Sequence, residues 1–272
     1  MSHFASRPEE IPDTDQHADV PLYGRCSPTP DDFRIDTQSS VRIYTAGGGG
    51  RDVFALGSIT IKSCHLHEGV GVRHTEIDYS NVDANEIRAI ALARRVLADM
   101  NINGRQVLVQ ERIPGVGLNV ARRNLSQDQR NNFKQQTREL FRRLRTTKPT
   151  DEHPARRHVV QDPDIINNGR IGQLEADILF SDSDIDTDMS FMHNDLSESN
   201  IIVDNDMVAG LVDWEMAGFF GWRTAGEVHR IIRTSQREHF AAVNLSEERL
   251  LDIMWWAHLY DLPEPHEDKS TH

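Results

Sequence analysis

The residues best suited to chemistry lie in one stretch of the sequence, Phe191–Glu215. It contains His193, Asp195 and Asn200 in the pattern H-x-D-x-x-x-x-N, and Asp213 follows an apolar run. Phosphoryl transfer requires a carboxylate that orients the attacking hydroxyl, and oxygen ligands for a magnesium ion that bridges the phosphates. Asp195 suits the first role. Asn200 and Asp213 suit the second, because Mg²⁺ prefers oxygen ligands.

A lysine and a helix carboxylate would complete this set, and the upstream sequence offers Lys62 and Glu86. Lys62 ends the run Ile-Thr-Ile-Lys, whose alternation is typical of a half-buried strand. Glu86 lies in a segment whose apolar residues recur at helical spacing. Asp83, one turn earlier, and Glu76, further upstream, are alternative partners for the lysine.

The elements that must position these residues follow from the apolar periodicity. Strands are expected over Val41–Tyr44, as a pair within Val53–Lys62 that is broken at Gly57, and over Gln106–Gly115, Ile201–Val203 and Val208–Asp213. Helices are expected from Asp83, after the N-cap residue Ser126 and over Glu227–Leu262, whereas Lys148–Asp188 is expected to be mostly irregular.

Composition restricts the class of protein. The net charge of −13 disfavours a nucleic-acid partner, because such binding rests on clusters of cations. No apolar run reaches 18 residues, which argues against a membrane span. Two cysteines cannot form a disulfide framework, so we expect a reducing, cytoplasmic compartment. Residues 1–40 are rich in proline and acidic residues and are predicted to form a disordered tail.

Three other motifs give weaker indications. Gly47–Gly50 lacks the G-x-G-x-x-G order of a phosphate loop and reads as a flexible turn or linker. Asp182–Asp188 imitates the start of a calcium loop, but Thr187 stands where the loop requires glycine. The histidines near residue 70 are spaced too irregularly for a zinc site.

Phe191–Glu215 resembles the catalytic (Brenner-type) loop and metal segment of the aminoglycoside phosphotransferase family, most closely its fungal members, within the protein-kinase-like superfamily. Trp214 and Glu215 follow Asp213 where protein kinases carry Phe-Gly, which favours the small-molecule branch. The resemblance implies an α+β, bilobal fold, with ATP and Mg²⁺ as cofactors. It also implies a hydroxyl of a small molecule as the acceptor.

The resemblance spans roughly residues 50–220 and implies further roles. The sequence QERIPG is similar to the family's hinge, so backbone groups from Glu111 to Ile113 would bind adenine. ITIK is similar to the strand whose lysine, here Lys62, contacts the phosphates, and DANEIRAI to the helix whose glutamate, here Glu86, holds it. His193 would support the loop by packing and hydrogen bonding.

The predicted domains are the tail (1–40), a β-rich N-terminal lobe with one helix (41–112), and a helical C-terminal lobe with the catalytic loop (113–272). Only about ten residues, Ala98–Val107, join the glutamate helix to the hinge strand, which predicts that the N-terminal lobe is shortened by a strand.

Two functions stay open. The first is an ATP-dependent phosphotransferase acting on a small-molecule hydroxyl; the second is a catalytically inactive kinase-like binding or scaffold protein. The absence of an A-P-E signature after Asp213 disfavours a protein kinase. The acceptor and the oligomeric state are not defined by the sequence.

Overall fold

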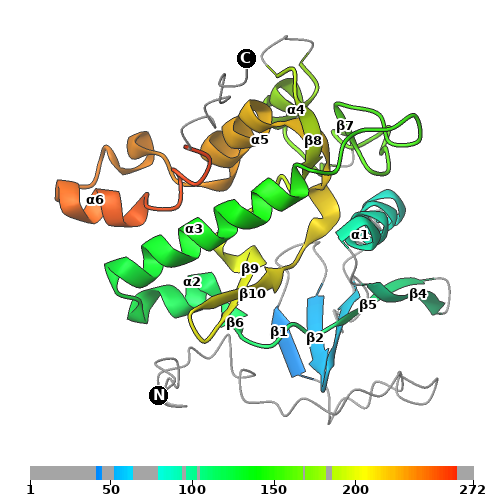
Figure 1. Cartoon of the computed structure of the whole chain (residues 1–272), viewed down its shortest axis with the longest axis horizontal. Helices are drawn as coiled ribbons and strands as arrows, with labels where there is room; N and C mark the ends of the chain where they lie inside the picture. The colour runs from blue at the N-terminus through cyan, green and yellow to red at the C-terminus, as the bar shows by residue number, and fades with distance from the viewer. Residues whose placement is uncertain are drawn as a thin grey trace, which may run out of the picture.

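The structure is a computed structural model of the chain and describes residues 41–44, 52–63, 79–93, 96–102, 105–167, 169–181 and 186–261. The predicted tail (1–40), the glycine run at 47–50 and the histidines at 65, 67 and 74 lie outside these ranges. The described residues form an antiparallel sheet with one helix beside it, followed by a mainly helical half (Figure 1). The predicted α+β class with these two parts is confirmed.

Five antiparallel strands make up the N-terminal sheet. In spatial order they are β1 (Val41–Tyr44), β2 (Asp52–Leu56), β3 (Ile59–Ser63), β5 (Arg105–Glu111) and β4 (Val96–Ile102). The break predicted at Gly57 is the turn between β2 and β3, and its positive φ of 57° is a conformation that glycine adopts without strain. Ile59 and Ile61 are buried, which leaves Lys62 on the opposite face of β3.

The predicted shortening of the N-terminal lobe is wrong. Val96–Ile102 forms β4 and pairs with β5 from Val96↔Gln110 to Ile102↔Arg105. The prediction assumed that another strand needs long turns on both sides. The pairing shows instead that a further strand fits between helix α1 (Ser80–Ala93) and β5.

Helix α1 (Ser80–Ala93) begins three residues before the predicted start. Its apolar face buries Val82, Ala89 and Ile90. Ala89 and Ile90 join an apolar cluster with Leu108 of the sheet and Trp214 of the C-terminal half. The helix therefore packs against both parts of the molecule.

The C-terminal half is built from short strands and helices around a second, larger core (Figure 1). Its helices are α2 (Leu118–Ala121), α3 (Gln127–Leu144), α4 (Gln173–Leu179), α5 (Trp222–Val228) and α6 (Glu247–Ile253). Its strands are β6 (Val116–Gly117), β7 (Arg157–His158), β8 (Met189–Met192), β9 (Ile201–Asp204), β10 (Met207–Leu211) and β11 (Gly218–Gly221). The strands form two sheets, in the orders β10-β9-β6 and β7-β11-β8.

Helix α3 begins where the sequence predicts. Ser126 is its N-cap: the hydroxyl accepts from the backbone N–H of Gln129, and the Gln129 side chain accepts from the backbone N–H of Ser126. This reciprocal pair satisfies two donors that have no partner within the helix. Phe133, Thr137 and Phe141 form its buried face.

The described part of Lys148–Asp188 is mostly irregular, as predicted, but it contains the seven-residue helix α4. The sequence did not reveal this helix, because the carboxylate of Glu175 lies on its buried face and interrupts the apolar period. One sequence prediction in this half needs correction. The C-terminal helix is broken: α5 continues into a π-helical turn, His229–Arg233, and α6 is separate. The sequence pattern also predicts that Leu251 lies on the packing face of this segment, but its side chain is 54% exposed. None of the helices in the described ranges combines the length and apolar character that crossing a bilayer requires.

The start of α5 yields a test of the fold. Asp186 caps this helix, since its carboxylate accepts from the backbone N–H groups of Arg223 (3.0 Å) and Thr224 (2.7 Å). A Cβ at Gly221 would lie 2.0 Å from the Asp186 Cγ. Gly221→Ala is therefore expected to lower the free energy of unfolding by about 1–3 kcal/mol, measured by urea denaturation.

A matched control precedes α4. Gly172 has nearly the same backbone conformation as Gly221, with φ −77° and ψ 163°, but a Cβ there meets nothing within 4 Å. Gly172→Ala is expected to change stability by less than about 0.5 kcal/mol. Equal effects of the two substitutions would contradict the steric explanation.

Candidate active site

Lys62 lies at the centre of a cluster of three carboxylates. Its Nζ is 2.9 Å from Oε2 of Glu86, 2.5 Å from Oδ1 of Asp213 and 3.3 Å from Oε2 of Glu215. The lysine side chain is only 13% exposed. The cluster therefore joins β3, α1 and the segment after β10, and it pairs Lys62 with Glu86 rather than with Asp83.

Glu86 anchors this cluster to the sheet. Its Oε2 accepts from Lys62, and its Oε1 accepts from Nε2 of Gln110 at 3.2 Å. The side chain is 1% exposed. Because both oxygen atoms are engaged by β3 and β5, Glu86 is suited to holding Lys62 in place.

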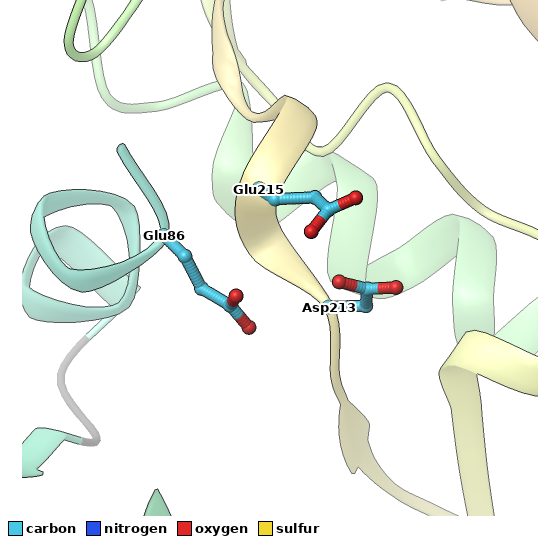
Figure 2. Close-up of side chains that lie close together, drawn as sticks. All are labelled: Glu86, Asp213 and Glu215. Carbon is cyan, nitrogen blue, oxygen red and sulfur yellow. The ribbon is translucent and has the colours of Figure 1, made fainter. Parts of the chain in front are cut away.

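Asp213 and Glu215 complete the cluster from the other side (Figure 2). One carboxylate oxygen of each, together with one of Glu86, lies within 4.8 Å of the others. Burial, with repulsion from Glu215 and Glu86, raises the pKa of the Asp213 carboxyl, while the ammonium of Lys62 opposes the rise. The close carboxylates thus repel one another, and a cation would relieve that repulsion.

Glu215 is a site residue that the sequence prediction did not assign, although it stands in the quoted Asp-Trp-Glu motif. It follows Asp213 by two residues in the 3₁₀ turn Trp214–Met216. Asp213 itself has a left-handed backbone, with φ 64° and ψ 63°. Such strain in a non-glycine residue persists where the surroundings hold it, commonly at functional sites. Here Trp214 stacks on Phe191 and packs against the ring of His193 in a tilted arrangement, which fixes the turn.

Asn85 ties α1 to the same turn. Its Nδ2 donates to the backbone oxygen atoms of Glu215 (2.7 Å) and Ala217 (3.0 Å), and its Oδ1 accepts from the backbone N–H of Val160 (2.6 Å). The residue is 2% exposed. Since Glu86 is its neighbour in the helix, Asn85 fixes the distance between Glu86 and Glu215.

Asp195 and Asn200 lie together in the loop before β9. Nδ2 of Asn200 donates to the backbone oxygen of Asp195 (2.8 Å) and to its Oδ2 (3.1 Å). Nε of Arg233 is 2.9 Å from Oδ1 of Asp195. Burial raises the pKa of Asp195, against the opposing effects of Arg233 and Asn200. The sequence prediction missed Arg233, because its contact joins segments that are distant along the chain.

The hairpin of β9 and β10 brings Asn200 beside the metal segment. Ile201 pairs with Leu211, and the backbone N–H of Val212 donates to the backbone oxygen of Asn200 at 3.0 Å. Asn205 and Asp206 form the turn with positive φ angles of 45° and 64°. The two strands predicted at Ile201–Val203 and Val208–Asp213 thus pair as a hairpin, which holds Asn200 next to Val212.

His193 lies under the loop. Burial lowers the pKa of this histidine to about 4, so the ring is neutral at pH 7. Its Nδ1 accepts from the backbone N–H of Asp195 (3.3 Å), and its Nε2 therefore carries the proton and donates to the backbone oxygen of Val212 (2.9 Å). Both ring nitrogens thus form hydrogen bonds with the backbone, one with Asp195 and the other with Val212.

Two tryptophans from the C-terminal segment support the loop. Nε1 of Trp256 donates to the backbone oxygen of Leu196 (2.8 Å), and Nε1 of Trp255 donates to Oε1 of Glu198 (3.0 Å). Both indoles are buried, and their N–H groups fix Leu196, which follows Asp195, and Glu198 in the same loop.

The segment proposed to bind adenine connects the two halves. Glu111 is the last residue of β5 and pairs with Ile59, and the backbone N–H of Arg112 donates to the backbone oxygen of Ser58 at 2.8 Å. Ile113 packs toward Gly210 of β10. Glu111 and Ile113 thus lie on the connection between the Lys62 sheet and the Asp213 hairpin.

The donor set fits a hard divalent cation. Among the described residues, the side chains that contact the Lys62 ammonium are three carboxylates, which together leave a surplus of negative charge. Asn200 uses its amide N–H group on Asp195, so its carbonyl oxygen stays an available type of ligand. Oxygen donors of this kind are those that Mg²⁺ prefers.

The sequence matches one family model, described as the phosphotransferase enzyme family (APH), over residues 83–225. No curated protein matches the sequence. The match covers more than half of the chain and includes Glu86, Asp195, Asn200 and Asp213.

Solved structures give weaker similarities. A streptomycin–ATP–APH(2″)-IIa ternary complex is 11% identical, with 79% of this chain and 76% of that chain covered and a TM-score of 0.44. The bifunctional kinase-methyltransferase WbdD is 15% identical, with 85% and 48% covered and a TM-score of 0.42. A thermostable mutant of the aminoglycoside phosphotransferase APH(4)-Ia is 14% identical, with 82% and 86% covered and a TM-score of 0.41.

Proposed function

The chain belongs to the phosphotransferase enzyme family, and from that premise we propose that it is an ATP-dependent enzyme that phosphorylates a hydroxyl group of a small molecule. One observation carries the proposal: Lys62 contacts Glu86 and Asp213 at once, although Asp213 lies 151 residues further along the chain. A lysine held by a helix carboxylate beside an acidic metal ligand is the arrangement that phosphoryl transfer requires.

Asp195 is proposed to orient the acceptor and take its proton. The acceptor oxygen attacks the γ-phosphorus of ATP, an oxygen–phosphorus bond forms, and the bond from that phosphorus to the bridging oxygen of ADP breaks. The hydroxyl proton passes to the Asp195 carboxylate, and ADP leaves with the bond's electron pair. The side-chain amide of Asn200 donates to Oδ2 of Asp195 and so holds the carboxylate during this step.

Lys62 is proposed to contact the α- and β-phosphates, with Glu86 as its anchor. Asn200 and Asp213 would hold Mg²⁺, and Glu215 adds a third oxygen ligand to that set. Bound Mg²⁺ supplies neutralisation of the charge on the transferring phosphoryl group. Backbone groups from Glu111 to Ile113 would bind the adenine ring.

Binding of ATP with Mg²⁺ is the first test. At a ligand concentration of about 100 times Kd, a protein that binds only when folded gains about 2.7 kcal/mol of stability, and a chain of this size gains roughly 5–10 °C in Tm. We expect such a shift by differential scanning fluorimetry with ATP and MgCl₂. ATP with excess EDTA should give a smaller shift.

The matched control is Lys62→Met, which removes the ammonium but keeps a linear side chain on β3. We expect no shift with this variant. If the natural chain shows no shift with either ATP or ADP plus Mg²⁺, the proposed function fails, and a kinase-like binding protein becomes the better description. If the natural chain does show the shift, phosphate transfer from ATP to a panel of hydroxylated metabolites would identify the acceptor.

A further inference from the structure

Arg233 makes the most informative contact that the proposed mechanism has not explained. It ends the π-helical turn His229–Arg233. Such turns are rare in proteins overall, and those that occur are often found at functional sites. Its Nε lies 2.9 Å from Oδ1 of Asp195 and 3.3 Å from the backbone oxygen of Asn194. Nε of the guanidinium therefore contacts both a side chain and a backbone oxygen of the catalytic loop.

The other edge of the guanidinium is held by α4. Nη1 of Arg233 donates to Oε2 of Glu175 at 3.0 Å, and Nη2 contacts the second carboxylate oxygen of the same residue. The Glu175 side chain is 4% exposed and that of Arg233 is 16% exposed. A bidentate pair of this kind fixes the plane of the guanidinium.

The contacts on Asp195 explain why its orientation matters. Oδ1 faces Arg233 and Oδ2 accepts from Asn200, so each oxygen is engaged once and keeps one lone pair for an acceptor hydroxyl. Without Arg233, only the Asn200 amide would define the carboxylate plane. Asp195 and Glu175 would also lose the cation between them.

We propose that Arg233, held by Glu175, is a positioning residue that fixes the carboxylate of Asp195 toward the acceptor hydroxyl. The inference rests on the proposed function, because it assigns a role in acceptor use. It does not involve nucleotide binding, since Arg233 contacts Asp195, Asn194 and Glu175 on the side of the loop formed by α4 and the π-helical turn.

The test compares Arg233→Met with Arg237→Met. Arg237 is four residues further along and forms an exposed ion pair with Glu247, so it controls for loss of one arginine charge. The reaction measured is ATP hydrolysis with water as the acceptor, which yields ADP and inorganic phosphate. Arg233→Met is expected to lower kcat by about 10²-fold, the usual effect of a misplaced reacting group, with KM for ATP unchanged. Arg237→Met is expected to keep the natural kcat.

Rescue distinguishes positioning from a general structural effect. In Arg233→Ala, added methylguanidinium is expected to restore at least a tenth of the natural kcat, whereas methylammonium, which lacks the planar fork, is not. If the single variants do not fold, Glu175→Leu/Arg233→Met removes both buried charges and is expected to fold with the same loss of kcat. An unchanged kcat in Arg233→Met or in the double variant overturns the inference.

A crystal structure of Arg233→Met, or of the double variant if the single variants do not fold, separates this inference from the proposed function. We expect the Asp195 carboxylate to rotate away from its present plane. If the natural chain neither binds nor hydrolyses ATP, the proposed function fails, and the position of this carboxylate still decides the inference. A carboxylate that keeps its place without Arg233 overturns it.

Discussion

Asp195→Ala is expected to lower the turnover of phosphoryl transfer by about 10²–10⁴-fold, the range for loss of a positioned acid–base group. The physical reason is that the carboxylate both orients the acceptor hydroxyl and takes its proton. Its two oxygens are held by Arg233 and Asn200, and neither a guanidinium nor an amide can take the proton in its place. Steady-state transfer from ATP to an acceptor, or to water, measures the loss.

Nucleotide binding provides the internal control for this prediction. Lys62, the proposed phosphate contact, forms its ion pairs with Glu86, Asp213 and Glu215 and not with Asp195. The thermal shift with ATP and MgCl₂ should therefore persist in Asp195→Ala. Asp204→Ala, an exposed acidic residue at the end of β9, should leave turnover unchanged. Natural turnover in Asp195→Ala would reject the catalytic role.

Asp213→Asn is expected to abolish the stabilising effect of Mg²⁺ on ATP binding and to lower turnover by at least about 10²-fold. The substitution keeps the shape of the side chain but removes one of the three carboxylate charges around Lys62. A site with a smaller negative surplus binds a divalent cation more weakly. Titration of MgCl₂ against ATP binding and turnover measures both effects.

Stability without ligand shows whether this loss is specific. Because burial and the repulsion from Glu215 and Glu86 disfavour the charged form of Asp213, its neutral replacement should leave Tm in EDTA equal to the natural value or above it. Lys62 keeps Glu86 and Glu215 as partners. A variant that is less stable in EDTA and still responds fully to Mg²⁺ would contradict the assigned role of Asp213.

Local patterns in the sequence predicted the elements that carry the site. The alternation before Lys62, the N-cap residue Ser126 and the strands on either side of Asn205 each lie within a few consecutive residues, where periodicity and turn chemistry act. The hairpin that places Asn200 beside Val212 follows from the same signals. For these parts, local preference and the final fold agree.

The features that were missed depend on contacts between distant segments. Glu175 and Arg233 are separated by 58 residues, and neither has a neighbouring residue that marks it as functional. Glu175 is also the reason that α4 was not predicted, because a carboxylate in the sequence indicates a solvent-exposed position, whereas this one is buried. Strand β4 was missed for another reason: its alternation of Val96, Ala98, Met100 and Ile102 is visible in the sequence, but the room needed for its turn was overestimated.

The three hydrogen bonds of Asn85 restrict how the molecule can be controlled. In proteins that switch by swinging a helix, the carboxylate that pairs with the lysine leaves the site. Here such a movement of α1 would break the bonds to Val160, Glu215 and Ala217, at about 1 kcal/mol each, and would also expose Ala89 and Ile90. Molecules with α1 displaced would therefore make up about one in a hundred or fewer. The rate of phosphoryl transfer would then depend on the concentrations of the substrates rather than on the position of this helix.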